Sequence, residues 1–361
     1  ANPTGPLHIG HGRGGIIGDV LASILTFLGH TVAKEYYIND AGNQIEKLGH
    51  SFKIRCMQAA GREAELPEEG YHGEYLISLA QECYTSFGDE LFTKDDTFFS
   101  SYAKEHLLEK IRQTLTDYGI TFDVWFSETS LHTSGAIQVV LDQLKEQGHI
   151  FTEDGTEWLK TTAFGDDKDR VVRKKSGELT YIAADIGYMQ DKIARGFDHL
   201  ICILGQDHHS YLTRLKAVIE ALGYDPQRLD IILYQLVTIK EDGILLRLSK
   251  RAGRIVGLED IIKTVGKDVA RFFYLHKKAD AHLEFDLALA LKHTDENPLY
   301  YIQYAYVRIK SITEKSYQYE QLHEISEKDI ASLGTSEALL IKKIASLKEL
   351  LSSIEKNYQT H

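Results

Sequence analysis

Two histidines near the start of the chain stand at a spacing that suits phosphate chemistry. The stretch LHIGHGRGG, residues 7 to 15, places His8 and His11 around an Ile–Gly pair and has four glycines within six positions. A helix that begins here offers backbone N–H groups and the positive end of its dipole, with little side chain in the way. The imidazoles would donate to phosphate oxygens whose charge grows during attack at the α-phosphorus, and Gly10 would leave room for a base or ribose. The segment therefore favours an ATP-dependent activation.

The same letters allow other interpretations. Gly10, Gly12 and Gly15 match the G-x-G-x-x-G pattern of dinucleotide-binding folds, and Glu35 stands where that pattern expects an acid that binds ribose. The pattern requires a strand directly before it, whereas ANPTGPLHI contains two prolines, which suit a loop. The dinucleotide interpretation is therefore disfavoured. The structural alternative is that His8 and His11 are two surface histidines beside a turn. Other motifs must decide between this alternative and a phosphate-binding role.

Two further polar segments lie far downstream. RLSKRAG, residues 247 to 253, is a Ser-Lys-Arg cluster after a predicted strand, and GQDHH, residues 205 to 209, follows a continuous apolar run. Ligands in α/β sheets gather at the carboxyl ends of strands, so Asp207 and His208 are expected at a nucleotide. The segment HIGH, residues 8 to 11, resembles the HIGH motif of class I aminoacyl-tRNA synthetases, and RLSK resembles their KMSKS motif. GQDHH resembles the segment of the same enzymes that holds the ATP ribose.

Further segments narrow the resemblance to arginyl-tRNA synthetases, over residues 1 to about 312. They are ANPTGPLHIGHGRGGIIGD, YYINDAGNQI, FDVWFSE, DKDRVVRKKSGELTYIAADIGY, FDLAL and NPLYYIQYAYVRI. The resemblance implies ligation of L-arginine to tRNA(Arg) through an arginyl-adenylate, formed from ATP with release of pyrophosphate. It also implies that tRNA must be present for activation and that the ribose 2′-OH accepts the arginyl group. Mg²⁺ is expected with the nucleotide, and no protein-bound metal site is predicted.

A receptor for arginine must satisfy a permanent, planar cation. A guanidinium presents a fork of five N–H donors, so it needs carboxylates and a flat neighbour. Tyr181 and Asp185 stand four residues apart at the start of a predicted helix, which puts both on one side of a pocket. The resemblance implies that Asp185 and Glu128 pair with the guanidinium and that Tyr181 covers it. A helix cap for Asp185 and a solvated loop for Glu128 are the structural alternatives. The other residues that the resemblance places at the amino acid are Asn2, which would hold the α-amino group, Gln206 and His209.

Lys250 is the residue expected to stabilise the α-phosphate and pyrophosphate as a mobile cation. Arg247 stands where the family pattern usually has the first Lys, which keeps the charge but not the compact ammonium. Losing an oriented cation typically costs on the order of 100-fold in rate, so we expect activity to survive because the charge is retained. The arginine carboxylate would attack the α-phosphate in line, without a nucleophilic triad. The predicted catalytic residues are His8, His11 and Lys250, and the predicted ATP-binding residues are His8, Gly10, His11, Gly205, Asp207, His208, Val237 and Lys250.

The segment NPLYYIQYAYVRIK carries four candidate tyrosines for nucleic-acid stacking, with cations at its end. Tyr301 and Tyr304 could stack on anticodon bases while Arg308 meets phosphates. The same helical spacing equally fits packing against other helices. Because the chain carries a net charge of −12, phosphate contacts must be concentrated, and tRNA binding should weaken steeply with salt.

Alternating strand-like and helix-like segments position these residues. A helix is predicted over 16–28, a strand within 31–40, and buried parallel strands at 199–205 and 230–239, with a helix over about 209–222 between them. Hairpins are predicted at 152–158 and 173–181, and the charged, helical residues 51–118 are predicted as an insertion. After about residue 258 strand signals vanish, and 326–361 is predicted as amphipathic helix. The fold class is therefore α/β: a Rossmann-like parallel-sheet catalytic domain over 1–257 with a helical insertion, followed by an all-α part over 258–361 that contains a helical linker and a partial anticodon-binding domain.

Bulk composition bounds the class of protein. A chain of 361 residues that is 43% hydrophobic and 26% charged is ordinary for a globular protein. Its three cysteines have no CxxC spacing, which indicates a reducing cytoplasm. No apolar run approaches the ~18 residues that span a bilayer. We therefore expect a cytoplasmic monomer that binds tRNA and arginine and no membrane.

The chain begins with Ala and its motifs begin at once. We expect a piece of a longer chain, without the family's small N-terminal domain and without the end of the anticodon-binding domain. Two alternatives from other classes stay open. One is a non-catalytic RNA-binding relative, motivated by Arg247 and the expected missing ends. The other is a small-molecule nucleotidylyltransferase, which would have no use for the helical C-terminal third.

Overall fold

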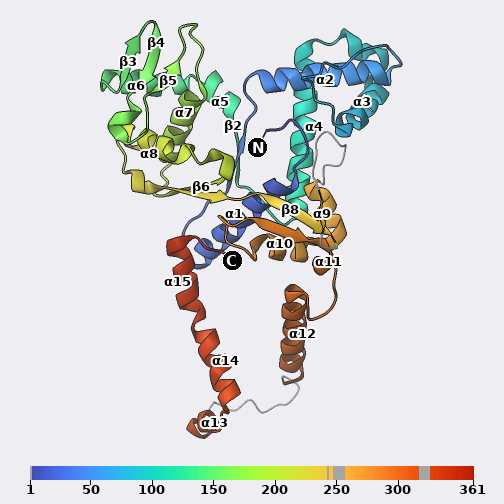
Figure 1. Ribbon diagram of the computed structural model, residues 1–361, viewed down its shortest axis with the longest axis vertical. Helices are drawn as coiled ribbons and strands as arrows, with labels where there is room; N and C mark the ends of the chain where they lie inside the picture. Colours follow the sequence, from blue (N-terminus) through green and yellow to red (C-terminus); the bar gives the residue numbers. More distant parts are fainter. Residues whose placement is uncertain (1, 242–243, 247–256, 317–325) are drawn as a thin grey trace.

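The computed structural model describes residues 2–241, 244–246, 257–316 and 326–361. Its elements form two lobes, a layer beneath them that contains α1, and two helical legs below that layer (Figure 1). The first described residues lie between the two lobes, and the C-terminus lies at the layer beneath them (Figure 1).

Two pairs of parallel strands form the framework of the α/β part. Strand β1 (Glu35–Ile38) pairs with β2 (Val124–Ser127), and β6 (Leu200–Gly205) pairs with β7 (Leu229–Tyr234). Helix α1 (Ile9–Phe27) crosses β6 so closely that a Cβ at Gly18 would lie 3.0 Å from Cδ1 of Ile203. Parallel strands end at the same edge, so the residues after β1 and β2 are neighbours, as are those after β6 and β7. The predicted α/β class with parallel sheets is confirmed.

Each part of the molecule has its own hydrophobic core. One lobe packs helices around the antiparallel β3–β4–β5 sheet, and its elements are α5 (Glu128–Thr133), α6 (Ala136–Glu146), β3 (Ile150–Glu153), β4 (Thr156–Leu159), β5 (Arg170–Arg173), α7 (Tyr181–Ala194) and α8 (Tyr211–Ala221). The other lobe is the helical insertion, with α2 (Asn43–Ala59), α3 (Glu74–Phe87) and α4 (Asp96–Asp117). Its first helix begins at Asn43, earlier than the predicted start at residue 51. The third core joins α1 to α9 (Leu258–Val265), α10 (Lys267–Leu275) and β8 (Val237–Glu241).

The prediction of a single strand over 230–239 is wrong. Strand β7 ends at Tyr234, and β8 (Val237–Glu241) begins in another sheet, between β9 (Ile244–Leu246) and β10 (Leu283–Asp286). The break falls at Gln235, whose backbone N–H donates to the carbonyl of Ala279 at 2.8 Å and whose carbonyl accepts from Arg13 at 3.0 Å. These two bonds turn the chain out of the first sheet, although the apolar run continues.

The prediction that strands cease near residue 258 is also wrong. Strand β10 pairs in parallel with β8, opposite Val237 to Lys240. Leu283 and Phe285 are buried, whereas Glu284 between them is exposed. This alternation is typical of a strand, but four residues are too few to stand out between helical patterns.

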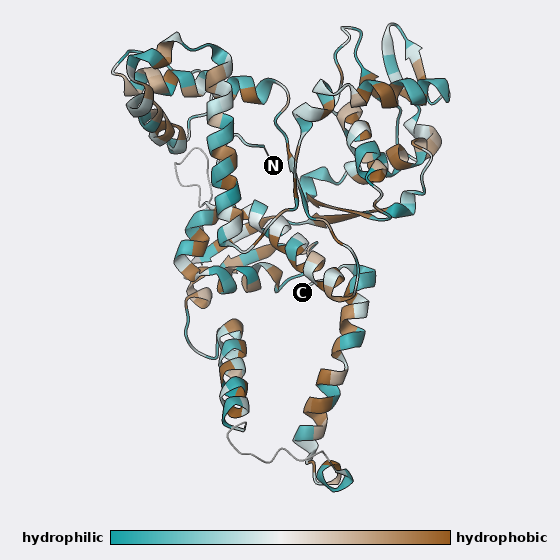
Figure 2. Cartoon of the chain, turned by 180° about the vertical axis from the view of Figure 1, so that it is seen from behind, coloured by the Kyte–Doolittle hydropathy of each residue, from teal (hydrophilic) through white to brown (hydrophobic). Residues whose placement is uncertain are grey.

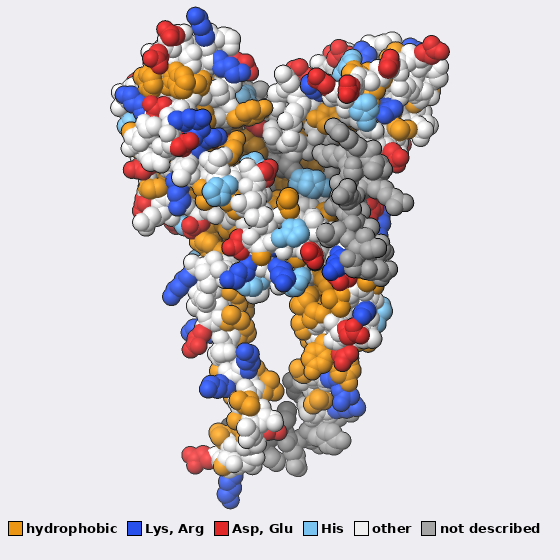
Figure 3. Space-filling model, in the orientation of Figure 1, with side chains coloured by type: hydrophobic (Ala, Val, Ile, Leu, Met, Phe, Trp, Pro, Cys, Tyr) orange, Lys and Arg blue, Asp and Glu red, His pale blue; other side chains and the backbone are white. Residues whose placement is uncertain are grey.

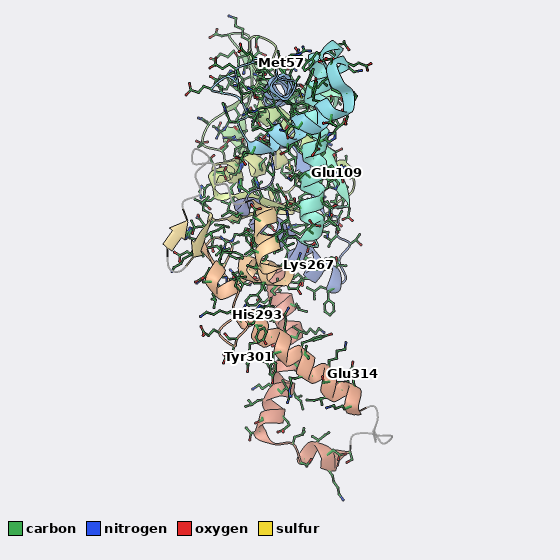
Figure 4. All side chains as sticks on the ribbon, turned by 90° about the vertical axis from the view of Figure 1, so that its right-hand side faces the viewer. Met57, Glu109, Lys267, His293, Tyr301 and Glu314 are labelled. Atoms are coloured by element: carbon green, nitrogen blue, oxygen red, sulfur yellow. The ribbon has the colours of Figure 1, made fainter. Side chains whose placement is uncertain are left out.

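The C-terminal residues form two legs instead of one tail helix. Helix α12 (Pro298–Ser316) is one leg, and it runs away from Lys267 of α10, with Tyr301 and Glu314 along its length (Figure 4). The predicted amphipathic helix over 326–361 is three helices, α13 (Glu327–Ala331), α14 (Thr335–Ala345) and α15 (Leu347–Asn357). The last of these docks beside α1, where Nε2 of His30 and Oε1 of Glu355 form a hydrogen bond of 2.6 Å.

Hydrophobic residues recur along both legs (Figure 2), and their side chains are exposed there (Figure 3). The residues that are more than half exposed are Tyr301, Ile302, Tyr304, Tyr306, Val307, Ile309 and Ile312 on α12, Ile330 on α13, and Leu339, Leu340, Ile341, Ile344, Leu347 and Leu350 on α14 and α15. Among the described helices, none combines the length and the apolarity that a bilayer crossing requires.

Candidate active site

The first turn of α1 is capped by the two histidines of the glycine-rich segment. Nδ1 of His8 accepts from the backbone N–H of Gly10 at 3.1 Å, and Nδ1 of His11 accepts from the backbone N–H of His8 at 3.3 Å. The two rings stack with their centroids 3.6 Å apart. Because both Nδ1 atoms accept, each neutral ring carries its proton on Nε2. The two imidazoles thus cap the N-terminus of α1. Their Nε2–H groups are donors at the positive end of the helix dipole.

Glycine is needed at positions 10 and 12 for close packing. A Cβ at Gly10 would lie 3.0 Å from Cε1 of His8, and a Cβ at Gly12 would lie 2.4 Å from Cδ1 of Leu258. The first contact keeps room for the capping imidazole, and the second lets α9 approach α1. Both glycines thus hold the histidine turn in place.

Arg13 fixes the start of α1 to the strands that follow residue 235. Its side chain is fully buried, and it donates to the carbonyls of Gln235 (3.0 Å), Ala281 (2.7 Å) and Lys278 (2.7 Å). The first of these carbonyls lies two residues before β8. Arg13 therefore ties the start of α1 to the chain just before β8.

The carboxyl ends of β6 and β7 meet the same part of α1. Gly205 ends β6 opposite Tyr234 of β7, and a Cβ at Gly14 would lie 2.6 Å from Cε1 of Tyr234. Burial raises the pKa of the Tyr234 phenol, and the negative charge of Asp207 raises it further. The predicted ATP-binding residues of GQDHH thus lie near the predicted histidine turn.

Side chains of the GQDHH segment differ in exposure. Asp207 and His209 are exposed, whereas Gln206 and His208 are half-buried. Nε2 of His208 lies 3.6 Å from Oδ2 of Asp207, and its ring meets that of Tyr211 edge to face. The short helical turn over Gln206–His208 holds these groups at the end of the strand.

Glu128 begins α5 directly after β2, at the edge where β1 also ends. Its side chain is buried, with Nε2 of His132 at 3.8 Å. Burial raises the pKa of the Glu128 carboxyl, although a hydrogen bond with Tyr37 and the neighbouring His132 oppose this effect. A carboxyl that is shielded from water and has polar neighbours on two sides, here Tyr37 and His132, can bind a cation.

Asp185 lies in the first turns of α7, which packs against both strands of the same pair. Tyr188 of α7 places its ring 4.6 Å from that of Tyr37 and 4.7 Å from that of Phe126. The Oδ2 atom of Asp185 is buried and has no hydrogen-bond partner among the described residues. Burial raises the pKa of Asp185 to about 7, where Arg214 lowers it and the charge of Glu128 raises it.

Tyr37 interacts with both acids. Burial raises the pKa of its phenol, and the negative charges of Glu128 and Asp185 both add to this effect, with a hydrogen bond to Glu128. The two carboxyls predicted to bind a guanidinium are therefore close enough to act electrostatically on the same phenol and on each other. Tyr181 is the first residue of α7 and is 72% exposed, so its ring is accessible beside Asp185.

The remaining predicted residues are less central to this geometry. Asn2 is exposed, and its amide donates to Gln44 in the first turn of α2. Val237 begins β8 with its side chain in the core, so only its backbone could meet a nucleotide. Arg308 is exposed on α12, as are Tyr301 and Tyr304. Arg247 and Lys250 lie outside the described residues.

The dinucleotide alternative fails on two observations. Residues 2 to 7 form no strand before α1, and only an isolated bridge joins His8 to Gly257. Glu35 is engaged elsewhere, in an ion pair of 2.7 Å with Arg195. Among the described residues no group of three or more His, Cys, Asp or Glu side chains could hold a metal ion.

Sequence analysis missed Tyr37, Asp40 and Arg13 as parts of the site. Tyr37 and Asp40 flank the end of β1, where polar side chains gather in parallel sheets, so that rule would have found them. Arg13 stands among small residues, and its three carbonyl partners are more than 200 residues away. No local sequence pattern predicts contacts over such separations.

Two family models match most of the chain. The model described as tRNA synthetases class I (R), catalytic domain, matches residues 1–280, and the DALR anticodon binding domain matches residues 302–361. The chain is 49% identical over 316 residues to the arginine–tRNA ligase of Moorella thermoacetica, covering 86% of this chain and 56% of that protein. It is 44% identical over 361 residues to that of Bacillus licheniformis, covering 98% of this chain and 64% of that protein. The chain thus spans less than two thirds of these relatives.

Solved structures agree with these matches. A putative arginyl-tRNA synthetase from Campylobacter jejuni superimposes with a TM-score of 0.90 at 38% identity, covering 100% of this chain and 79% of that one. The arginyl-tRNA synthetase of Thermus thermophilus, at 17% identity and a TM-score of 0.73, shares the fold. These findings do not favour a nucleotidylyltransferase. The chain belongs to the arginyl-tRNA synthetase family, with a class I catalytic domain followed by a DALR anticodon-binding domain.

Proposed function

We propose that the protein ligates L-arginine to tRNA(Arg), through an arginyl-adenylate formed from ATP with release of pyrophosphate. One observation carries the proposal: Glu128 follows β2, Asp185 lies on the helix that packs against β1 and β2, and the two acids interact electrostatically with Tyr37 and with each other while burial raises the pKa of both. Such a pair is costly to ionise unless a cation with several donors joins it. A guanidinium supplies both the charge and the fork of N–H groups.

At the amino-acid end, Glu128 and Asp185 would pair with the guanidinium, and the accessible ring of Tyr181 would cover it. Asn2 would hold the α-amino group. Gln206 and His209, which follow β6, would line the same pocket. These roles follow the family resemblance, and the electrostatic interaction between Glu128 and Asp185 supports them.

At the nucleotide end, the Nε2–H groups of His8 and His11 would donate to phosphate oxygens at the positive end of α1. The arginine carboxylate would attack the α-phosphate in line, so the chain's task is positioning and charge stabilisation. Lys250 would neutralise the charge that develops on the leaving pyrophosphate. Mg²⁺ would arrive with the triphosphate. The other residues proposed at ATP are Gly10, Gly205, Asp207, His208 and Val237.

On the RNA side, Tyr301, Tyr304 and Arg308 would contact the tRNA. Their exposure on α12 supports this role. We further propose that the protein works as a monomer in the cytoplasm, as its cysteine usage favours.

The test is arginine-dependent exchange of pyrophosphate into ATP in the presence of cognate tRNA, with calorimetry of arginine binding beside it. Glu128→Gln and Asp185→Asn should each raise the arginine KM at least about tenfold, because a buried charge partner is removed. Asp142→Asn, on the exposed side of α6, is the matched control. It should change neither the arginine KM in the exchange assay nor the arginine affinity in calorimetry. Intact tRNA binding without any exchange would instead favour a non-catalytic relative.

A further inference from the structure

Asp40 is a buried acid beside the proposed site that the proposed mechanism does not use. It follows β1 by two residues and is only 7% exposed. Buried carboxylates are costly unless several donors satisfy them, so the contacts of Asp40 indicate its role.

Those contacts converge on the two residues that flank Glu128. The hydroxyl of Ser127 donates to both carboxylate oxygens of Asp40, at 2.9 and 2.8 Å. The backbone N–H of Thr129 donates to Oδ1 at 3.1 Å, and the Thr129 hydroxyl donates to the backbone carbonyl of Asp40 at 3.0 Å. The residue before Glu128 and the residue after it are thus both tied to the end of β1.

One cation completes this arrangement. Nζ of Lys104, from α4 of the helical insertion, lies 3.3 Å from Oδ2 of Asp40. Every group that reaches the Asp40 carboxylate in these contacts is a donor. An asparagine there would turn an N–H group toward one of those donors, so it would break the arrangement with almost no change in volume.

We propose that Asp40 is a positioning residue, which holds the Ser127–Thr129 turn so that the Glu128 carboxyl faces the guanidinium of bound arginine. The inference rests on the proposed function, since it assumes that Glu128 binds arginine. Asp40 itself touches no substrate. It acts through Glu128 alone.

The test is a double-mutant cycle on arginine affinity, measured by calorimetry with the full-length protein. Asp40→Asn should weaken arginine binding about 10- to 100-fold, the loss expected when a buried charged acceptor is disrupted. In the Glu128→Gln background the same change should have little further effect, because the two residues act as a unit. Equal losses in both backgrounds, or wild-type affinity in Asp40→Asn, would overturn the inference.

A second ligand separates positioning from direct contact. 5-Guanidinopentanoate is arginine without its α-amino group, so it keeps the guanidinium and the carboxylate and lacks only the α-ammonium. Asp40→Asn should weaken both ligands by the same factor, with the KM for ATP unchanged. A loss confined to arginine would show that Asp40 contacts the α-ammonium, and it would refute the positioning role.

Two further variants distinguish a loss of positioning from a general folding defect. Ser127→Ala removes one donor and keeps the acid, so it should weaken both ligands a few-fold and again only when Glu128 is present. Asp166→Asn alters an equally buried acid that is paired with Arg170 at 2.7 Å instead of with the Ser127–Thr129 turn, and it should leave affinity unchanged. If the wild type binds no arginine, the proposed function fails and the inference falls with it, whereas normal binding by both Asp40→Asn and Ser127→Ala defeats the inference alone.

Discussion

Replacing Asp185 with asparagine should stabilise the protein in the absence of arginine while it removes arginine binding. The pKa of this carboxyl is raised from 3.8 to about 7, by burial first, with Arg214 opposing and Glu128 adding. Since a change of one in pKa corresponds to about 1.4 kcal/mol, ionising Asp185 costs about 4 kcal/mol more in the folded protein than in the unfolded chain. The asparagine amide is neutral but still buried, so we expect a net gain of about 1–3 kcal/mol near pH 8.

The pH dependence fixes the sign of this effect. At a pH between the two values, the folded protein holds a proton on Asp185 that the unfolded chain has lost. Wild-type stability therefore falls as pH rises from about 4 to about 7 and levels off above that range. The variant lacks this slope, so its advantage should be small near pH 4 and complete near pH 8.

Urea unfolding followed by circular dichroism, at a series of pH values, measures the difference. Asp166→Asn is the control with the opposite sign: burial raises the pKa of Asp166, but hydrogen bonds from Arg170 and Asp167 and the charge of Arg170 together lower it to about 2. That variant should lose stability, mainly above about pH 4. An Asp185→Asn protein no more stable than the wild type near pH 8, or equally stabilised at every pH, would refute the electrostatic reasoning.

The remaining predictions concern affinity, packing and catalysis. Arginine affinity should fall about tenfold from pH 8 to pH 6 in calorimetry, because guanidinium binding requires both acids ionised, and a flat profile would contradict this. Gly12→Ala should lower stability by about 1–3 kcal/mol in urea, since its Cβ would lie 2.4 Å from Leu258; full stability would show that α9 yields. Arg13→Met should cost several kcal/mol and lower kcat, because it leaves buried carbonyls without a donor, and unchanged kinetics would show that the β8–β9 hairpin is held otherwise. Lys250→Ala should depress pyrophosphate exchange about 100-fold with tRNA binding intact; unaltered exchange would remove its proposed role.

Local patterns predicted the framework of the fold, and long-range contacts determined the rest. The helix after the glycine-rich segment and the strand ending at Gly205 follow from periodicity and apolar runs, which act within one element. The division of 230–239 into two strands depends on Arg13 bonding to the Gln235 carbonyl across 222 residues. The short strand at Leu283 depends on pairing with β8. Neither contact leaves a local trace in the sequence.

The candidate site divides in the same way. Chemistry and resemblance indicated Glu128 and Asp185, because a guanidinium requires acids and both follow recognisable motifs. The strand-end rule points to Tyr37 and Asp40, but it does not show what they contact. That Tyr37 interacts with both acids depends on how α7 packs on β1 and β2, through Tyr188. The positioning role proposed for Asp40 depends on Ser127, which is 87 residues away.

The environment of Asp185 bears on how the pocket would tell arginine from lysine. An acid whose pKa is about 7 is partly protonated near neutral pH, so its ionisation must be recovered from the ligand. A planar fork of five donors can reach Glu128 together with the Oδ2 atom of Asp185, which has no hydrogen-bond partner in the described part of the chain. A lysine ammonium is a compact point charge on a shorter side chain, so it would pair with one acid and leave the other protonated. Discrimination would then arise from the cost of ionising the second carboxyl, and the rigid hold on Glu128 matters because a carboxyl free to turn toward an ammonium would reduce that cost.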